Sequence, residues 1–183
     1  MPQRLIAIDP GTEYCGICKT EYDEDCEILS IEALTIRSDK VILPEAKIRA
    51  HVHGERYCRL MKLSHAFREI VLEYQPNVIV CEMPFYHNLH PGAFAPLVEC
   101  VFTLRNVSMD INPEIPFIGY APMVIKKIFA GRTNAKKPDM KEALLSKPSL
   151  IKLLPTHPDQ LSEHAIDSIA VAISHLTTAR KGP

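Results

Sequence analysis

The apolar positions of the first forty residues gather into three short runs that turn residues separate. We expect strands over about residues 4–9, 14–20 and 27–36. The first run ends at Asp9, after which Pro10 and Gly11 must turn the chain, because proline cannot donate to a sheet and glycine adopts turn geometries closed to other residues. The acidic stretch 22–25 separates the second run from the third. This pattern predicts an antiparallel meander.

Beyond residue 40 the apolar positions take up helical spacing and then alternate with short apolar strands. An all-apolar run at 77–81, of the kind found in buried strands, ends in the carboxylate of Glu82. The other elements that we expect are helices at about 49–74, 91–109, 123–130, 138–146 and 160–178, and a strand at 116–120. Three strands followed by alternating helices and strands predict an α/β protein with a central five-stranded mixed sheet flanked by helices.

The composition is that of an ordinary globular protein, with 183 residues, 46% apolar and 23% charged. We expect a single domain over residues 1–183. No apolar run approaches the ~20 residues of a membrane span, and the first strand begins without a visible targeting segment, so we expect a cytoplasmic protein without a membrane partner. Cys15 and Cys18 have the spacing of a redox or zinc pair, but strand positions three apart point to opposite faces, so we expect core cysteines.

Charge is unevenly distributed, although the formal net charge is only −1. Residues 9–32 contain eight acidic residues and a single base. Residues 126–141 contain six bases and a single acid, and the bases are Lys126, Lys127, Arg132, Lys136, Lys137 and Lys141. A separated basic segment is typical of a phosphate-binding surface, although a solvated loop has the same composition.

Two of the apolar strands end in carboxylates, Asp9 and Glu82. Strand ends in a sheet covered by helices bring distant side chains into one crevice, although Asp9 alone would also fit the cap of a turn. The last helix adds His164 and Asp167, which lie three positions apart on one helix face. Carboxylates brought together repel unless a cation lies between them, and such oxygen ligands suit Mg²⁺ or Mn²⁺. These four residues form a candidate metal site.

With these motifs the chain resembles the RuvC-type Holliday-junction resolvases of the ribonuclease H-like superfamily. IDPGTEYCG looks like the first-strand motif of that family, CEMPF like its second acidic strand end, and HAIDSIAVAISH like its C-terminal helix. GYAPMVIKKIFAGRTNAKK is similar to the segment that carries the family's DNA-contacting lysines. The four motifs occur in the family's order over residues 5–176.

The resemblance implies a ribonuclease H-like fold and a structure-selective endonuclease that resolves Holliday junctions by paired symmetric nicks from a homodimer. It implies two Mg²⁺ or Mn²⁺ ions per active site, held by Asp9, Glu82, His164 and Asp167, with Lys126 as a further catalytic residue. The DNA-binding residues expected are Phe85, Lys126, Lys127, Arg132, Lys136 and Lys137. Phe85 matches the aromatic residue that the family inserts at the junction centre, where it would stack on a base.

One ligand departs from the family pattern, because many members have aspartate where this chain has His164. If His164 lies off the site, Glu163 or Asp159 would serve instead. The dimer surface is expected on the helix at 91–109, with plain core packing as the alternative. Two other functions stay open: a broader fork and flap endonuclease of viral type, and a non-catalytic junction-binding module. The host is then a bacterial cell or a virus-infected cell.

Overall fold

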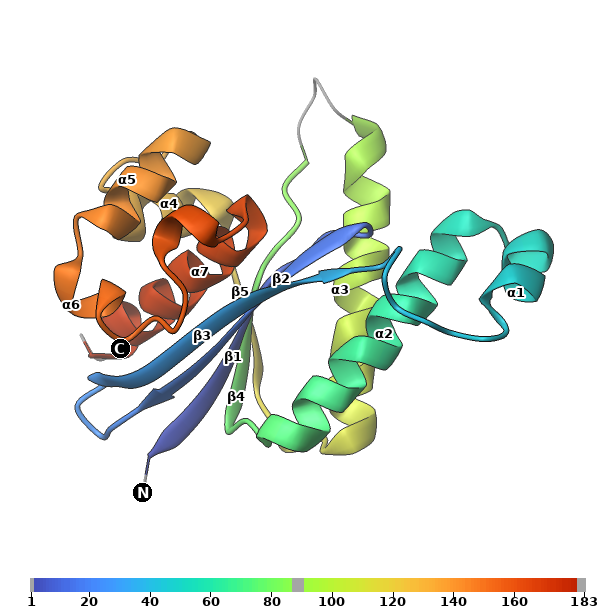
Figure 1. The fold of residues 1–183 in the computed structure, drawn as a ribbon, viewed down its shortest axis with the longest axis horizontal. Helices are drawn as coiled ribbons and strands as arrows, with labels where there is room; N and C mark the ends of the chain where they lie inside the picture. Colours follow the sequence, from blue (N-terminus) through green and yellow to red (C-terminus); the bar gives the residue numbers. More distant parts are fainter. Residues whose placement is uncertain (1, 87–90, 181–183) are drawn as a thin grey trace.

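The computed structural model describes residues 2–86 and 91–180, and its centre is a five-stranded sheet (Figure 1). The strands are β1 (Gln3–Asp9), β2 (Tyr14–Tyr22), β3 (Ile28–Arg37), β4 (Val78–Glu82) and β5 (Phe117–Tyr120), arranged in the order β3-β2-β1-β4-β5. The pairs β1–β2 and β2–β3 are antiparallel, whereas β1–β4 and β4–β5 are parallel. The predicted meander and the predicted mixed sheet are both confirmed.

Helices cover both faces of this sheet (Figure 1). Helices α2 (Glu55–Tyr74) and α3 (Pro91–Ile111) lie on one face, with α1 (Ala46–His53) packed against α2. Helices α4 (Pro122–Ala130), α5 (Lys137–Leu145) and α7 (Glu163–Arg180) lie on the other face. Helix α6 (Pro148–Ile151) and a 3₁₀ turn (Pro158–Gln160) connect α5 to α7. None of the helices in the described ranges is long and apolar enough to cross a bilayer.

Successive side chains of β1 and β2 point to opposite faces of the sheet, and each face carries one hydrophobic core. Leu5 and Ala7 pack in the core under α7, whereas Ile6 and Ile8 pack in the core under α2 and α3. Cys18 belongs to the first core and Cys15 to the second, and all six cysteines are free thiols. The sheet therefore separates the two thiols, as predicted, and they form no redox or zinc pair.

The helix boundaries differ from the prediction in three places. The helix expected at 49–74 is divided at Gly54, whose φ of 87° is outside the helical region. The last helix begins at Glu163 instead of 160, because Pro158 opens a separate 3₁₀ turn. Helix α6 was not predicted, since four residues are too few to show helical periodicity.

Candidate active site

Asp9 and Glu82 end two neighbouring parallel strands. The last paired residues of β1 and β4 are Ile8 and Cys81, so the acids that follow them leave the sheet side by side. Ala7, two residues before Asp9, and Val80, two residues before Glu82, both belong to the core under α7. Because side chains on a strand alternate with a period of two, both carboxylates point toward the α7 side of the sheet.

Gly16 allows the first turn of α7 to lie directly on β2. A Cβ atom on Gly16 would be 1.9 Å from the carbonyl oxygen of His164 and 3.2 Å from the Cβ of Asp9. Any side chain at this position would therefore push the start of α7 away from the sheet. The absence of a side chain at Gly16 thus lets His164 approach Asp9.

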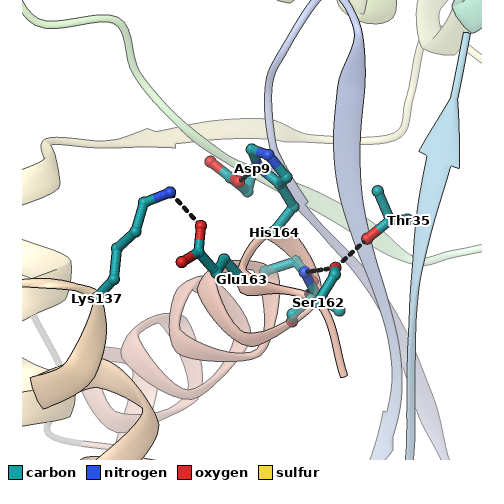
Figure 2. A network of polar contacts seen from close by, with 8 residues as sticks. Asp9, Thr35, Lys137, Ser162, Glu163 and His164 are labelled. Carbon is teal, nitrogen blue, oxygen red and sulfur yellow. Dashed lines mark hydrogen bonds and ion pairs between the residues drawn. The ribbon is translucent and has the colours of Figure 1, made fainter. Parts of the chain in front are cut away.

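Ser162 caps the same turn of the helix. Its Oγ accepts a hydrogen bond from the backbone N–H of Ala165 at 3.1 Å and contacts Oγ1 of Thr35 in β3 (Figure 2). This contact fixes the start of α7 to the sheet at a second point. Sequence reasoning did not select Ser162, although a serine three residues before a helical N–H is a recognisable capping signal.

His164 lies within the acidic site. Its Nδ1 is 2.8 Å from Oδ2 of Asp9, and this hydrogen bond raises the pKa of the imidazole above its usual value. The ring of Tyr14 stacks on the imidazole, with centroids 5.7 Å apart and planes 5° apart. The guanidinium of Arg37 lies 5.5 Å from the Tyr14 ring centroid. No sequence signal pointed to Tyr14, because its partner is far away in the chain.

Two acids of the site, Glu82 and Asp167, have raised pKa values. Burial, followed by the charges of Asp9 and Asp167, raises the pKa of Glu82 to about 8. Burial, followed by the charge of Asp9, raises the pKa of Asp167 to about 6. Lys126 opposes both shifts, which places its ammonium within electrostatic range of the two acids. The structure thus brings together the four predicted ligands and the predicted catalytic lysine.

This donor set fits a hard divalent cation. Part-buried carboxylates that repel one another are stabilised by a bound cation, and oxygen ligands are those that Mg²⁺ and Mn²⁺ prefer. In residues 2–86 and 91–180, no three His, Cys, Asp or Glu side chains already stand together as ligands of one ion. Oδ2 of Asp9 is hydrogen-bonded to His164, so a cation bound through that oxygen would replace this contact.

The two alternatives to His164 are held by surface lysines instead. Glu163 pairs with Lys137 (Figure 2), and Asp159 pairs with Lys141 at 2.8 Å. Both acids are exposed, with 58% and 63% of their side-chain surface accessible. They are thus poorer candidates than His164, which contacts Asp9 directly.

The predicted DNA-binding bases divide into two groups. Arg132 pairs with Asp139, and Lys137 pairs with Glu163, so both are held by acids of the chain itself. Within the described residues the other three form no ion pair, and they are Lys126, Lys127 and Lys136. Lys137 also lies within electrostatic range of His164 and Asp167, which links the basic segment to the acids.

Phe85 follows the second acidic strand end, three residues after Glu82. Its side chain belongs to none of the described cores, and 57% of its surface is exposed. An exposed aromatic ring next to a strand-end acid is available for stacking on a base.

The mixed sheet, its two helical layers and the acids at its strand ends define a ribonuclease H-like α/β protein. A family model described as "Crossover junction endodeoxyribonuclease RuvC" matches residues 5–175. The chain belongs to this family of nucleases. Its curated relatives include the RuvC of Desulforamulus reducens, 30% identical over 93% of this chain and 91% of the relative. The RuvC of a Polaromonas species is 26% identical over 97% of this chain and 86% of the relative.

Solved structures of the same family share the fold. Thermus thermophilus RuvC superposes with a TM-score of 0.69 at 18% identity, covering 98% of this chain and 97% of that one. The T. thermophilus protein in complex with a Holliday junction substrate gives 0.68 at 16% identity, with the same coverage of 98% and 97%. The yeast mitochondrial Holliday junction resolvase gives 0.62 at 15% identity, covering 98% of this chain and 82% of that one. At such identities the likeness concerns the fold.

Proposed function

We propose that this chain is a structure-selective DNA endonuclease that resolves Holliday junctions by hydrolysing one phosphodiester bond in each of two opposed strands. The observation that carries the proposal is the convergence of Asp9, Glu82 and Asp167, from two strand ends and one helix, with His164 bonded to Asp9. Relatives with the same family assignment, and a T. thermophilus RuvC solved with a Holliday junction substrate, support it.

Three carboxylates and an imidazole would hold two Mg²⁺ or Mn²⁺ ions. Two such cations, when bound, activate the attacking water and stabilise the leaving oxygen. Asp9 would be the central ligand, because it neighbours both Glu82 on the adjacent strand and His164 on α7. Asp167 would hold one cation, since its raised pKa marks a carboxylate that a positive charge stabilises.

The other proposed roles belong to side chains around the acids. Lys126, within electrostatic range of Glu82 and Asp167, would hold the scissile phosphate. Phe85 would stack on a base at the junction centre. The remaining bases of the segment would bind the phosphate backbone, and they are Lys127, Arg132, Lys136 and Lys137.

We infer a homodimer whose interface includes α3. This helix buries Cys100 and Leu104 against the sheet, while Val98, Phe102 and Met109 stay 43%, 64% and 54% exposed. These three residues share one helix face, so α3 has an apolar surface without a partner in the described chain. A two-fold pair of sites would match the two-fold symmetry of a four-way junction.

The test is cleavage of labelled DNA of different shapes in Mg²⁺ and in Mn²⁺. We expect paired symmetric nicks in a four-way junction and slower cleavage of a fork, a flap or a linear duplex. Equal cleavage of forks and flaps would favour the broader branched-DNA endonuclease. Tight junction binding without cleavage in either metal would favour a non-catalytic module.

A further inference from the structure

A second pocket lies next to the active site, on the side of α1 and α2. Its volume is about 430 Å³, and its walls come from the start of β2, the segment after β3, and the helices α1 and α2. Tyr14 lines this pocket, and the same residue stacks on His164. Tyr14 is therefore common to the lining of the pocket and to the surroundings of His164.

Three bases reach this pocket: Lys47 from α1, and Arg59 and Lys62 from α2. Within the described residues Lys47 and Lys62 form no ion pair. The nearest acid to Arg59 is Glu13, whose Oε1 lies 3.9 Å from Nη1, too far for a hydrogen bond. The positive charges in the pocket are thus weakly neutralised.

The remaining acids do little to change this balance. Asp39 lines the pocket but is bonded to Arg37 through both carboxylate oxygens. Glu55 lies at the first turn of α2 and contributes one negative charge. The lining has three bases and three acids, and the ion pair between Asp39 and Arg37 leaves it a surplus of one positive charge.

Arg59 carries an unsatisfied donor. Its Nε is buried and has no hydrogen-bond partner among the residues that the structure describes. A buried charged donor without a partner is destabilising, so such a group is normally satisfied by an acceptor. A guanidinium beside two unpaired lysines is suited to a phosphate oxygen.

The pocket and the basic segment at 126–141 lie on opposite sides of the sheet. Figure 1 shows α1 and α2 on one side and α4 and α5 on the other, with the strands between them. Asp9 ends β1 between these two sides, beside His164 and Tyr14. A nucleic acid bound at the acids would thus meet positive charge on both sides.

We propose that this pocket is a second phosphate-binding site for DNA, in which Lys47, Arg59 and Lys62 contact the backbone of an arm that leaves the active site across Tyr14. The inference rests on the proposed function, since it requires a branched-DNA substrate at the acids. It adds a surface on the α1–α2 side, in a pocket that none of the predicted DNA-binding residues lines.

The experiment measures four-way-junction binding by fluorescence anisotropy at several salt concentrations, for Lys62→Ala and for Lys47→Ala/Lys62→Ala. The control is Lys152→Ala, which removes an exposed lysine just after α6. We expect the double variant to bind roughly tenfold more weakly at low salt, and its log–log salt slope to decrease by about two, one per lost phosphate contact. Lys152→Ala should overlay the wild type.

Overlaid isotherms for the wild type and the double variant would overturn the inference while leaving the proposed function intact. Failure of the wild-type chain to bind branched DNA at all would overturn both. A further measurement tests for a free anion: the melting temperature in inorganic phosphate and in chloride at equal ionic strength, for the wild type and Arg59→Ala. Stabilisation of the wild type alone by phosphate, together with overlaid DNA isotherms, would assign the pocket to a small anion and overturn the DNA contact.

Discussion

The acidic site and the basic segment at 126–141 are built in opposite ways. The acids are part-buried, and their positions follow from strand register and from the close contact at Gly16. The bases are mostly exposed, and Arg132, Lys137 and Lys141 are paired with acids of the same chain. The proposed catalytic groups are thus fixed by the fold, whereas the proposed DNA-binding groups are unpaired or held in exchangeable surface contacts.

This difference has an energetic reason. An exposed ion pair contributes about 0–1 kcal/mol, so a phosphate can take the place of Glu163 on Lys137 at little cost. The acids, by contrast, cannot move without a shift of the backbone, because strand pairing fixes Asp9 and Glu82 and the close contact at Gly16 fixes the start of α7. Changes in the acids should therefore affect chemistry strongly, and changes in the bases should affect affinity modestly.

The largest effect is expected from Asp9→Asn, which keeps the shape of the side chain and removes its charge. Several kcal/mol of transition-state stabilisation would be lost, equivalent to roughly a thousandfold slower cleavage. Junction binding should stay near wild type, because the phosphate contacts are separate. Single-turnover cleavage and anisotropy measure the two properties. Asp110→Asn, at an exposed position of α3, is the control. Cleavage by Asp9→Asn within tenfold of wild type would contradict the assignment.

The Gly16→Ala variant tests whether the close contact between β2 and the start of α7 is needed to form the site. The added Cβ would collide with the backbone of His164 at 1.9 Å, so the start of α7 must move. Overpacking of this kind costs about 1–3 kcal/mol, and we expect the melting temperature to fall by about 3–10 °C with a marked loss of cleavage.

The matched control is Gly92→Ala, because a Cβ on Gly92, in α3, would meet no atom within 4 Å. That variant should keep both stability and activity. A Gly16→Ala protein with unchanged melting and cleavage would mean that the contact with α7 is unimportant.

The sequence was sufficient for features that depend on local pattern. Strands ending in Asp9 and Glu82 were visible as apolar runs, and their side-by-side position follows from parallel pairing. It was insufficient for contacts between distant segments, such as Tyr14 on His164 or Thr35 on Ser162. The break at Gly54 was missed because the apolar positions with helical spacing, from Leu60 to Tyr74, all lie after it. Ion pairs such as Lys137–Glu163 depend on how α5 packs on α7, which no local pattern encodes.

A smaller effect concerns the stability of the protein in EDTA. Burial, followed by the charges of Asp9 and Asp167, raises the pKa of Glu82 in the folded protein from its usual 4.5 to about 8. Between these pH values the unfolded chain loses the proton while the folded one keeps it, so stability decreases as pH rises. Glu82→Gln cannot ionise and should melt on the order of 5 °C higher than wild type at pH 8, with little difference near pH 4.5.

Thermal melts of the metal-free protein across this pH range check the prediction, with Glu69→Gln at an exposed position of α2 as the control. Added Mg²⁺ should stabilise wild type more than Glu82→Gln at pH 8, because the cation offsets the repulsion. Parallel melting curves for wild type and Glu82→Gln would show that Glu82 is not electrostatically coupled to the other acids.

For the bases we expect changes of only a few fold. Lys126→Ala and Lys137→Ala should each weaken junction binding and reduce the salt slope by about one. Lys137→Ala should cost less, because Lys137 must first leave Glu163. Glu163→Gln frees this lysine and should strengthen binding a few fold, whereas Glu142→Gln, an exposed acid of α5, should not. Isotherms at several salt concentrations that overlay for all four variants would mean that the segment is only a solvated surface.

The smallest and most informative effect concerns His164, where the fixed and the exchangeable parts of the site meet. Its imidazole is hydrogen-bonded to Asp9, and this contact raises the pKa of the imidazole above its usual value in the metal-free protein. A cation that binds the imidazole must displace its proton, so at limiting metal the cleavage rate should fall as the pH decreases through the raised pKa. This fall is the acidic limb of the pH–rate profile, and a higher metal concentration should shift it to lower pH.

Imidazole is a better ligand for Mn²⁺ than for Mg²⁺, so wild type should be a few fold faster in Mn²⁺. His164→Asp replaces the imidazole with an oxygen ligand; it should reduce the Mn²⁺ advantage and move the acidic limb downward, because the usual pKa of aspartate is about 3.9. His164→Ala should lose activity in both metals. Cleavage rates against pH, at two concentrations of each metal, separate these outcomes for the three proteins.

If His164→Ala keeps the wild-type profile, the imidazole only orients Asp9 before the metal arrives. The acidic limb would then belong to Asp167, whose pKa is raised to about 6 by burial and by Asp9.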